Sequence, residues 1–176
     1  MTFNVLRTVY FPYFHSVMSY GIIFWGNSHL STKISKTQKR NIRIINNKGK
    51  RYSCRQLFRI LQILTFPSQY VFSLLVCVNK NKRLCLSKSD IHDINTRNIY
   101  NFPLPSTNLT LAQKGIYFPG SKVFNHLPKS IKNLFHDFKR FKFVLKSFLT
   151  EHTFYSLEEF YQLTTNWQWF FLFLVF

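Results

Sequence analysis

The chain has 176 residues, of which 46% are hydrophobic and 19% aromatic, so it can bury the core of one modest domain and is too apolar to be disordered as a whole. Its 24 Lys and Arg outnumber six Asp and Glu, which gives a formal net charge of +18, and the first acid is Asp90. Such an excess repels itself unless a polyanion neutralises it, so it favours nucleic acid as a partner over a merely soluble basic surface.

The first predicted element is an uncharged helix. Residues 9–26 read VYFPYFHSVMSYGIIFWG, and no Lys, Arg, Asp or Glu occurs from Thr8 to Thr32. Apolar residues at i+4 spacing form two adjacent rows, which predicts a broad apolar helical face. One row is Val5, Val9, Tyr13 and Val17, and the other is Leu6, Tyr10, Phe14 and Met18. Because Pro12 costs a helix interior about 3 kcal/mol, we expect the helix to kink there or to begin near Phe11.

Two basic helices are predicted next, in a stretch from Lys33 to Arg59 that holds ten Lys or Arg and no acid. In ISKTQKRNIRII, residues 34–45, the apolar face is Ile34, Gln38, Ile42 and Ile45. NNKGK then supplies the turn residues that end this helix. In CRQLFRILQIL, residues 54–64, we expect Ser53 as the N-cap and Leu57, Leu61 and Leu64 on the inner face.

The cations of these two helices are the candidate site. They lie on the faces opposite the apolar residues, and for each of them a solvated helix surface is the alternative interpretation. We assign backbone phosphate contacts to Lys36, Lys39, Arg40, Arg43, Arg55 and Arg59.

The second half of the chain is less regular. Pro67 is expected in the first turn of a core helix over residues 68–80, and residues 79–118 are expected to be irregular, with short strands near residue 99 and at 115–117. A short helix stopped by Pro128 and the turn KSIKNL are predicted to precede an amphipathic helix, DFKRFKFVLKSFL, over residues 137–149. SLEEFYQL follows with a capping-box pattern, Ser156 and Glu159.

The sequence offers no recognisable catalytic or metal site. Magnesium-dependent catalysis needs converging carboxylates, and the six acids of this chain provide only the adjacent pair Glu158 and Glu159 and the SDIHD turn. No Walker loop, G-x-S-x-G or G-x-G-x-x-G occurs, and Cys54, Cys77 and Cys85 form neither a disulfide framework nor a C-x-x-C zinc motif. We predict no enzyme active site, no cofactor and no small-molecule substrate.

Several blocks, in this order, carry a family resemblance. LRTVYFPYFHSVMSYGIIFWGNS, KTQKRNIRII, CRQLFRILQILTFPSQYVFSLLVCVNKNK, IHDINTRN, LPSTNLTLAQKGIYFPGSKVFNHLPKSIKN and FKFVLKSFLTEHTFYSLEEF are together similar to the region after the palm in non-LTR, LINE-type, Jockey-like retrotransposon reverse transcriptases. The resemblance covers about residues 3–162. It implies a mainly α fold with a thumb-like region over 3–80 and C-terminal helices within 81–162, and it leaves an aromatic tail, 163–176, that does not match.

The resemblance also implies a function. Proteins of this family carry an endonuclease and an RNA-directed DNA polymerase that uses magnesium, whose F/Y-A-D-D catalytic block is not found in residues 1–176. The chain is then expected to be a C-terminal fragment that grips RNA and DNA through their phosphates and meets the palm and fingers of the parent polymerase. A nuclear or cytoplasmic location follows from the resemblance, and the absence of a signal-peptide pattern predicts that the chain is not secreted.

Two other functions are open on the sequence alone. Residues 9–26 have about the length of a membrane anchor, which makes a small membrane-associated basic protein one alternative, although Pro12, His15, Ser16 and Ser19 lower the apolarity of this stretch and disfavour it. The fragment is alternatively a co-opted interaction module that docks on the parent polymerase. An exposed apolar surface on the isolated chain would favour this interpretation.

Overall fold

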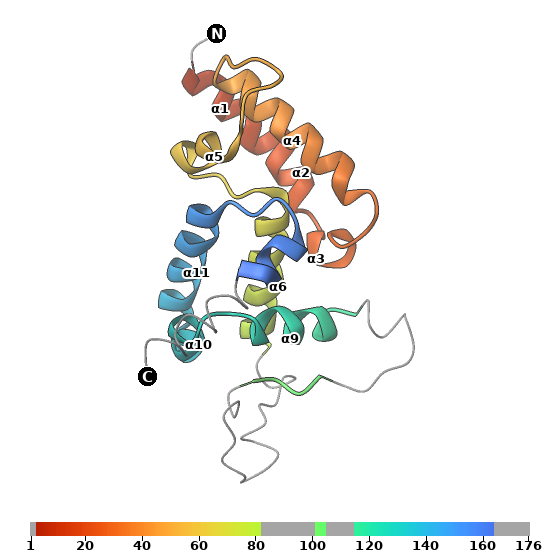
Figure 1. Cartoon of the computed structure of the whole chain (residues 1–176), viewed down its shortest axis with the longest axis vertical. Coiled ribbons are helices and arrows are strands. Elements are labelled where there is room, and N and C mark those ends of the chain that lie inside the picture. Colours follow the sequence, from red (N-terminus) through yellow and green to blue (C-terminus); the bar gives the residue numbers. More distant parts are fainter. Residues whose placement is uncertain (1–2, 82–100, 105–114, 164–176) are drawn as a thin grey trace. The chain divides into compact units, whose positions relative to one another are not determined.

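The computed structural model describes residues 3–81, 101–104 and 115–163, and these residues form helices and connecting turns without a strand (Figure 1). The predicted mainly α fold is confirmed. The chain divides into two compact units, Met1–Tyr70 with Lys146–Tyr155, and Val71–Leu145 with Ser156–Phe176. The predicted division between residues 80 and 81 falls at the end of a helix, α6 (Phe66–Lys80), and stays a prediction as a domain boundary.

The first unit begins with a helix that accommodates Pro12. α1 (Phe3–Tyr10) continues into a π-helical turn, Phe11–His15, and then into α2 (Ser16–Ser19). In the π turn the Ser16 amide donates to the carbonyl of Phe11, five residues back, and the Ser16 hydroxyl donates to the carbonyl of Pro12. The helix therefore does not begin near Phe11. A π turn widens the helix, which leaves space for the proline ring. The carbonyls of Phe11 and Pro12 accept their hydrogen bonds from the amide and the hydroxyl of Ser16, respectively.

The two apolar rows of this helix have different environments. Tyr10 and Met18 are buried, and Leu6 and Phe14 are partly buried beside them. The other row faces solvent, with Tyr13 77% and Val17 70% exposed. The broad apolar face that the sequence predicts is thus half core and half surface within this unit. After α2, Gly21 adopts a left-handed conformation (φ 59°) and leads into α3 (Ile22–Trp25).

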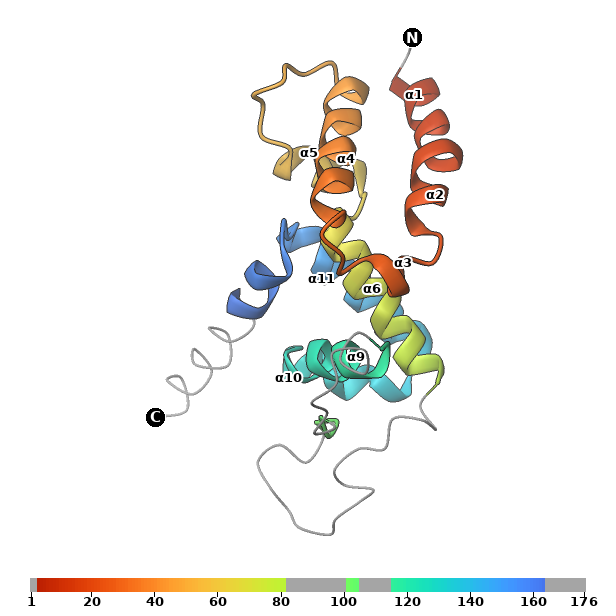
Figure 2. The ribbon, with the colours of Figure 1, turned by 90° about the vertical axis from the view of Figure 1, so that its right-hand side faces the viewer.

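α4 (Ser31–Ile45) and α5 (Arg55–Leu61) complete the core of the first unit, and α4 lies alongside α1 (Figure 2). Both helices turn the predicted apolar positions inward. The buried cluster consists of Tyr10, Ile42, Ile45, Cys54, Leu57, Phe58, Leu61 and Ile63. Gln38 is fully buried among them, and its Nε2 donates to the Tyr10 hydroxyl (3.1 Å) and to the Leu64 carbonyl (2.9 Å).

Both basic helices end in the same hydrogen-bonded motif. At the end of α4 the Lys48 amide donates to Arg43 O and the Asn47 amide to Ile44 O, with Asn47 at φ 50°. At the end of α5 the corresponding left-handed residue is Gln62, at φ 55°. These are Schellman ends, in which asparagine or glutamine takes the place usually held by glycine. The prediction that Ser53 caps α5 is wrong, because the N-cap is Cys54 and its side chain makes no capping bond.

A hydrogen bond brings a distant segment to this unit. Thr65 Oγ1 accepts from the Ser68 amide at the start of α6 (Phe66–Lys80) and donates to the carbonyl of Phe154 (2.5 Å). Pro67 lies in the first turn of α6, as predicted, where its missing N–H leaves no intrahelical bond unmade. The contact fixes residues 146–155 against the first unit and so positions Tyr155.

The second unit has an aromatic core. α9 (Tyr117–Asn125), α10 (Lys129–Lys132), a 3₁₀ turn (Asn133–His136) and α11 (Phe138–His152) follow in order, and α11 belongs to this unit as far as Leu145. The rings of Phe102, Phe124, Phe135 and Phe141 pack with centroids 4.4–5.6 Å apart. Gly120 brings α9 close to α6, since a Cβ there would lie 2.6 Å from a methyl of Val78.

The strand predicted at 115–117 is wrong. Gly115 and Ile116 form a bend, and Tyr117 begins α9, whose Val123 and Phe124 are buried. Residue 99, where the other short strand was predicted, lies outside the described residues, as does most of the segment expected to be irregular.

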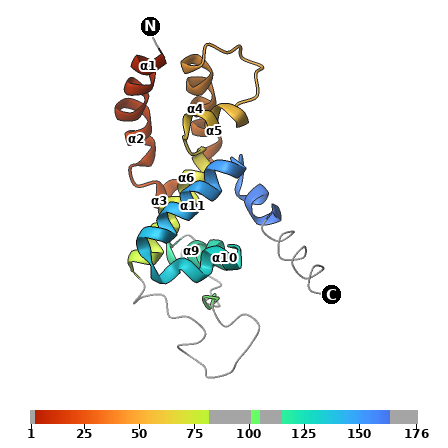
Figure 3. The ribbon, with the colours of Figure 1, turned by 90° about the vertical axis from the view of Figure 1, so that its left-hand side faces the viewer.

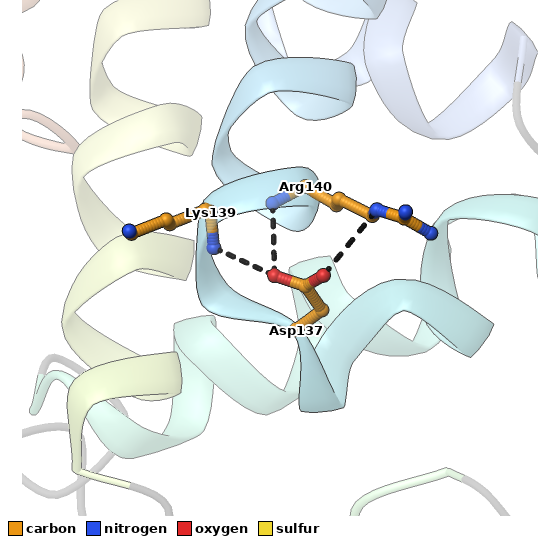
Figure 4. Close-up of polar contacts among 3 residues, drawn as sticks. All are labelled: Asp137, Lys139 and Arg140. Carbon is orange, nitrogen blue, oxygen red and sulfur yellow. Dashed lines mark hydrogen bonds and ion pairs between the residues drawn. The ribbon is translucent and has the colours of Figure 1, made fainter.

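Side-chain caps begin the last two helices. Asp137 Oδ1 accepts from the amides of Lys139 (3.1 Å) and Arg140 (3.2 Å), and its Oδ2 lies 3.5 Å from Arg140 Nε (Figure 4). The predicted cap at Ser156 is confirmed, because Ser156 Oγ accepts from the Glu159 amide (3.1 Å) at the start of the helix over 157–163.

Candidate nucleic-acid interface

The four predicted cations of α4 form one stripe. Lys36, Lys39, Arg40 and Arg43 occupy positions i, i+3, i+4 and i+7, so they follow one side of the helix over about 10 Å. Lys36 and Arg40 are exposed, whereas Lys39 and Arg43 are half-buried toward α5. The opposite side of α4 is held by buried Gln38, Ile42 and Ile45, which fixes the stripe outward.

Two of the six cations meet at one aromatic ring. Lys39 Nζ lies 3.6 Å from the centroid of the Tyr155 ring, and the guanidinium carbon of Arg55 lies 4.8 Å from the same centroid. Both distances are within the range of a cation–π contact. Tyr155 is half-buried against the core cluster of this unit, so it holds the α4 and α5 cations together on a fixed support.

Arg43 and Cys54 lie behind this contact. Arg43 Nε donates to the Tyr52 carbonyl (2.8 Å), which ties the end of α4 to the loop that leads into α5. The Cys54 thiol donates to the Lys39 carbonyl (3.6 Å). Burial raises the pKa of this thiol, and the charges of Arg43 and Lys39 oppose the rise only in part. Cys54 is therefore a buried, protonated link between the helices and not a reactive thiolate.

The unit that holds these residues is strongly basic. It contains twelve Lys or Arg and one acid, Glu151. Arg59, on α5, is exposed like Lys36 and Arg40. Among the residues that the structure describes, Lys36, Arg40 and Arg59 take part in no ion pair. Three charges are thus presented to solvent, and a phosphate backbone can neutralise them with release of its counterions.

Sequence reasoning missed two parts of this surface. Tyr155 was not assigned, because nothing local in the sequence connects it with Lys39. The sequence of the α4–α5 loop, which Figure 3 shows as an arch between the two helices, predicts only a helix end. Its residues from Asn47 to Ser53 are nevertheless all exposed. They include Lys48, Lys50, Arg51 and the aromatic Tyr52. Basic residues next to an aromatic one were the signal that could have found this loop.

Within residues 3–81, 101–104 and 115–163, no group of three or more His, Cys, Asp or Glu is placed to hold a metal ion. In the same ranges no single helix has the length and apolar character of a membrane span. α5 and α6 meet that criterion only as a pair, with a bend of 50° between them.

Comparison with known proteins gives no assignment. No protein-family model, no curated protein and no solved structure matches this chain.

Proposed function

We propose that this chain binds RNA and DNA without sequence preference, as a C-terminal fragment of a non-LTR retrotransposon reverse transcriptase. The observation that carries the proposal is the cation surface of α4 and α5, in which Lys36, Arg40 and Arg59 face solvent while Lys39 and Arg55 are gathered at Tyr155. The order of the sequence blocks described above supports the parentage. The fragment carries no catalysis of its own in this proposal, since the catalytic block of the family is not among its residues.

The geometry favours phosphate contact over base recognition. Lys and Arg on the outer face of a helix reach the backbone, which all sequences share, and each neutralised phosphate adds to the salt dependence of binding. A stripe about 10 Å long matches roughly three phosphates along one strand of a duplex.

Charge-matched variants test the location of the surface. Lys36→Gln, Arg40→Gln and Arg59→Gln together remove three exposed charges from the proposed surface. Lys129→Gln, Lys139→Gln and Lys142→Gln remove three exposed charges from the second unit and serve as the control. We expect the first triple variant to weaken binding of a mixed-sequence duplex and to lower the salt slope by about three, and the control to change both much less. Equal losses in the two variants would mean that net charge alone, and not this surface, controls binding.

The exposed row of the first helix favours a second function, docking on the body of the parent polymerase. Val5, Val9, Tyr13 and Val17 follow one side of the helix and are 45–77% exposed. A contiguous apolar surface of this kind on an isolated chain marks an interaction site and lowers solubility. We expect Val9→Ser with Val17→Ser to raise the soluble yield of the chain. An unchanged yield, with a monomeric wild-type protein that unfolds in one sharp transition, would count against the docking function.

A further inference from the structure

The loop between α4 and α5 forms an arch of the backbone (Figure 3). Its exposed residues include three cations and one tyrosine. At its start the Lys48 amide donates to Arg43 O (2.8 Å). At its end the Tyr52 amide donates to Gly49 O (3.1 Å), and the Tyr52 carbonyl accepts from Arg43 Nε (2.8 Å). These bonds fix the backbone on both sides of Tyr52, so the direction in which its side chain leaves the loop is set by the fold.

The Tyr52 ring is available, unlike that of Tyr155. It is 41% exposed, and its contact with Lys48, whose Nζ lies 5.2 Å from the ring centroid, is longer than the 3.6 Å contact of Lys39 with Tyr155. Lys48, Lys50 and Arg51 are exposed next to it in sequence. An exposed aromatic face flanked by cations is the arrangement on which proteins stack the bases of single strands while they track the phosphates.

We propose that the loop of residues 46–53 makes this chain prefer single-stranded nucleic acid, with one base stacked on Tyr52 and the adjoining phosphates held by Lys48, Lys50 and Arg51. The inference rests on the proposed function and deepens it, since it names the form of the nucleic acid. In a duplex the base faces are covered by neighbouring base pairs, so Tyr52 has nothing to stack on and only the phosphate contacts remain.

The experiment compares a labelled oligo(dT) with a mixed-sequence duplex of equal length, at one salt concentration, on the full chain. Tyr52→Ala removes the ring and Tyr52→Phe keeps it. Tyr20→Ala is the matched control, because Tyr20 is an even more exposed tyrosine in a segment without Lys or Arg. We expect Tyr52→Ala to weaken oligo(dT) binding by about 10-fold and duplex binding by less than about 2-fold. Tyr52→Phe and Tyr20→Ala should bind both probes as wild type does.

A second measurement tests the inference if the Tyr52→Ala variant does not fold. Tyr52→Trp adds a fourth tryptophan at this position, and the wild-type chain, with its three tryptophans, is the baseline. Stacking of a base should quench the added emission on addition of oligo(dT) but not of the duplex. Oligo(dT) affinity that is unchanged in Tyr52→Ala, or equal quenching by both probes, would overturn the inference and leave phosphate binding intact. Failure of wild type to bind either probe in a salt-dependent way would instead overturn the proposed function, and the inference with it.

Discussion

Lys39 Nζ lies 3.6 Å from the centroid of the Tyr155 ring, although the two residues are far apart in the sequence. The contact exists because Phe154 is hydrogen-bonded to Thr65, which places the next residue, Tyr155, beside α4 and α5. Arg55 joins the same ring at 4.8 Å. The basic surface of α4 and α5 is therefore organised by residues 146–155, which are far from both helices in the sequence.

Truncation of Tyr155 should destabilise the first unit. Tyr155→Ala removes a ring that is partly buried against the core cluster, together with two cation–π contacts, so we expect the free energy of unfolding to fall by about 2 kcal/mol. Tyr155→Phe keeps the ring and most of the stability. Urea unfolding of both variants checks this. A double-mutant cycle with Lys39→Met should yield a coupling of about 0.5–1 kcal/mol, and a coupling of zero would show that the contact has no energetic weight.

Alkaline pH should weaken the first unit through Tyr10. Burial raises the pKa of Tyr10 to about 12, against which the hydrogen bond from Gln38 acts only weakly. Because the folded pKa lies above the unfolded value of about 10, the stabilisation is complete below pH 10 and is lost as the pH rises through 12. The total is of the order of 3 kcal/mol.

Comparison with Tyr10→Phe isolates this effect. The variant loses the acceptor for Gln38 and about 1 kcal/mol at pH 7, but it has no phenol to ionise. The difference in unfolding free energy between wild type and variant, measured in urea from pH 9 to 12, should shrink and change sign. A difference that stays constant over this range would contradict the burial of Tyr10.

Replacement of Pro12 should stabilise the first helix. Alanine restores a backbone donor and allows the five-residue π turn to tighten, so we expect Pro12→Ala to raise the free energy of unfolding by about 1 kcal/mol and the midpoint of thermal unfolding by roughly 2–4 °C. Scanning calorimetry measures both. A lower midpoint would mean that the wide turn itself is needed to place Tyr10 and Phe14 in the core.

The cap of α11 should matter more than the ion pair beside it. Asp137→Ala removes the acceptor for two amides and should cost about 1 kcal/mol. Arg140→Ala breaks an ion pair whose side chains are 78% and 50% exposed, and its effect should stay within about 0.5 kcal/mol. Chemical unfolding of the two variants compares their stabilities directly. A larger loss of unfolding free energy in Arg140→Ala would mean that the ion pair, and not the cap, contributes more to stability.

The sequence predicted those features that depend on local periodicity. Gln38, Ile42 and Ile45 of α4, and Leu57, Leu61 and Leu64 in and after α5, are buried as their spacing predicts. The Ser156 cap and the amphipathic α11 were predicted for the same reason, since each pattern lies within a few residues.

The parts that were not predicted depend on distant residues or on unusual backbone. Ile116 and Tyr117 have strand-forming side chains, but Tyr117 begins a helix because Val123 and Phe124 are buried in the second unit. Pro12 indicated a break, whereas a π turn accommodates it. The meeting of Lys39 and Arg55 at Tyr155 needs the return of residues 146–155, for which no local pattern gives a sign.

The most direct test of the central claim is the salt dependence of nucleic acid binding by the wild-type chain. The observed binding constant for a mixed-sequence duplex is measured between about 50 and 200 mM salt, where a surface that neutralises several phosphates loses affinity steeply. We predict a log–log slope of several units, reduced by about three in the variant that lacks Lys36, Arg40 and Arg59. A binding constant that does not change with salt would contradict the account.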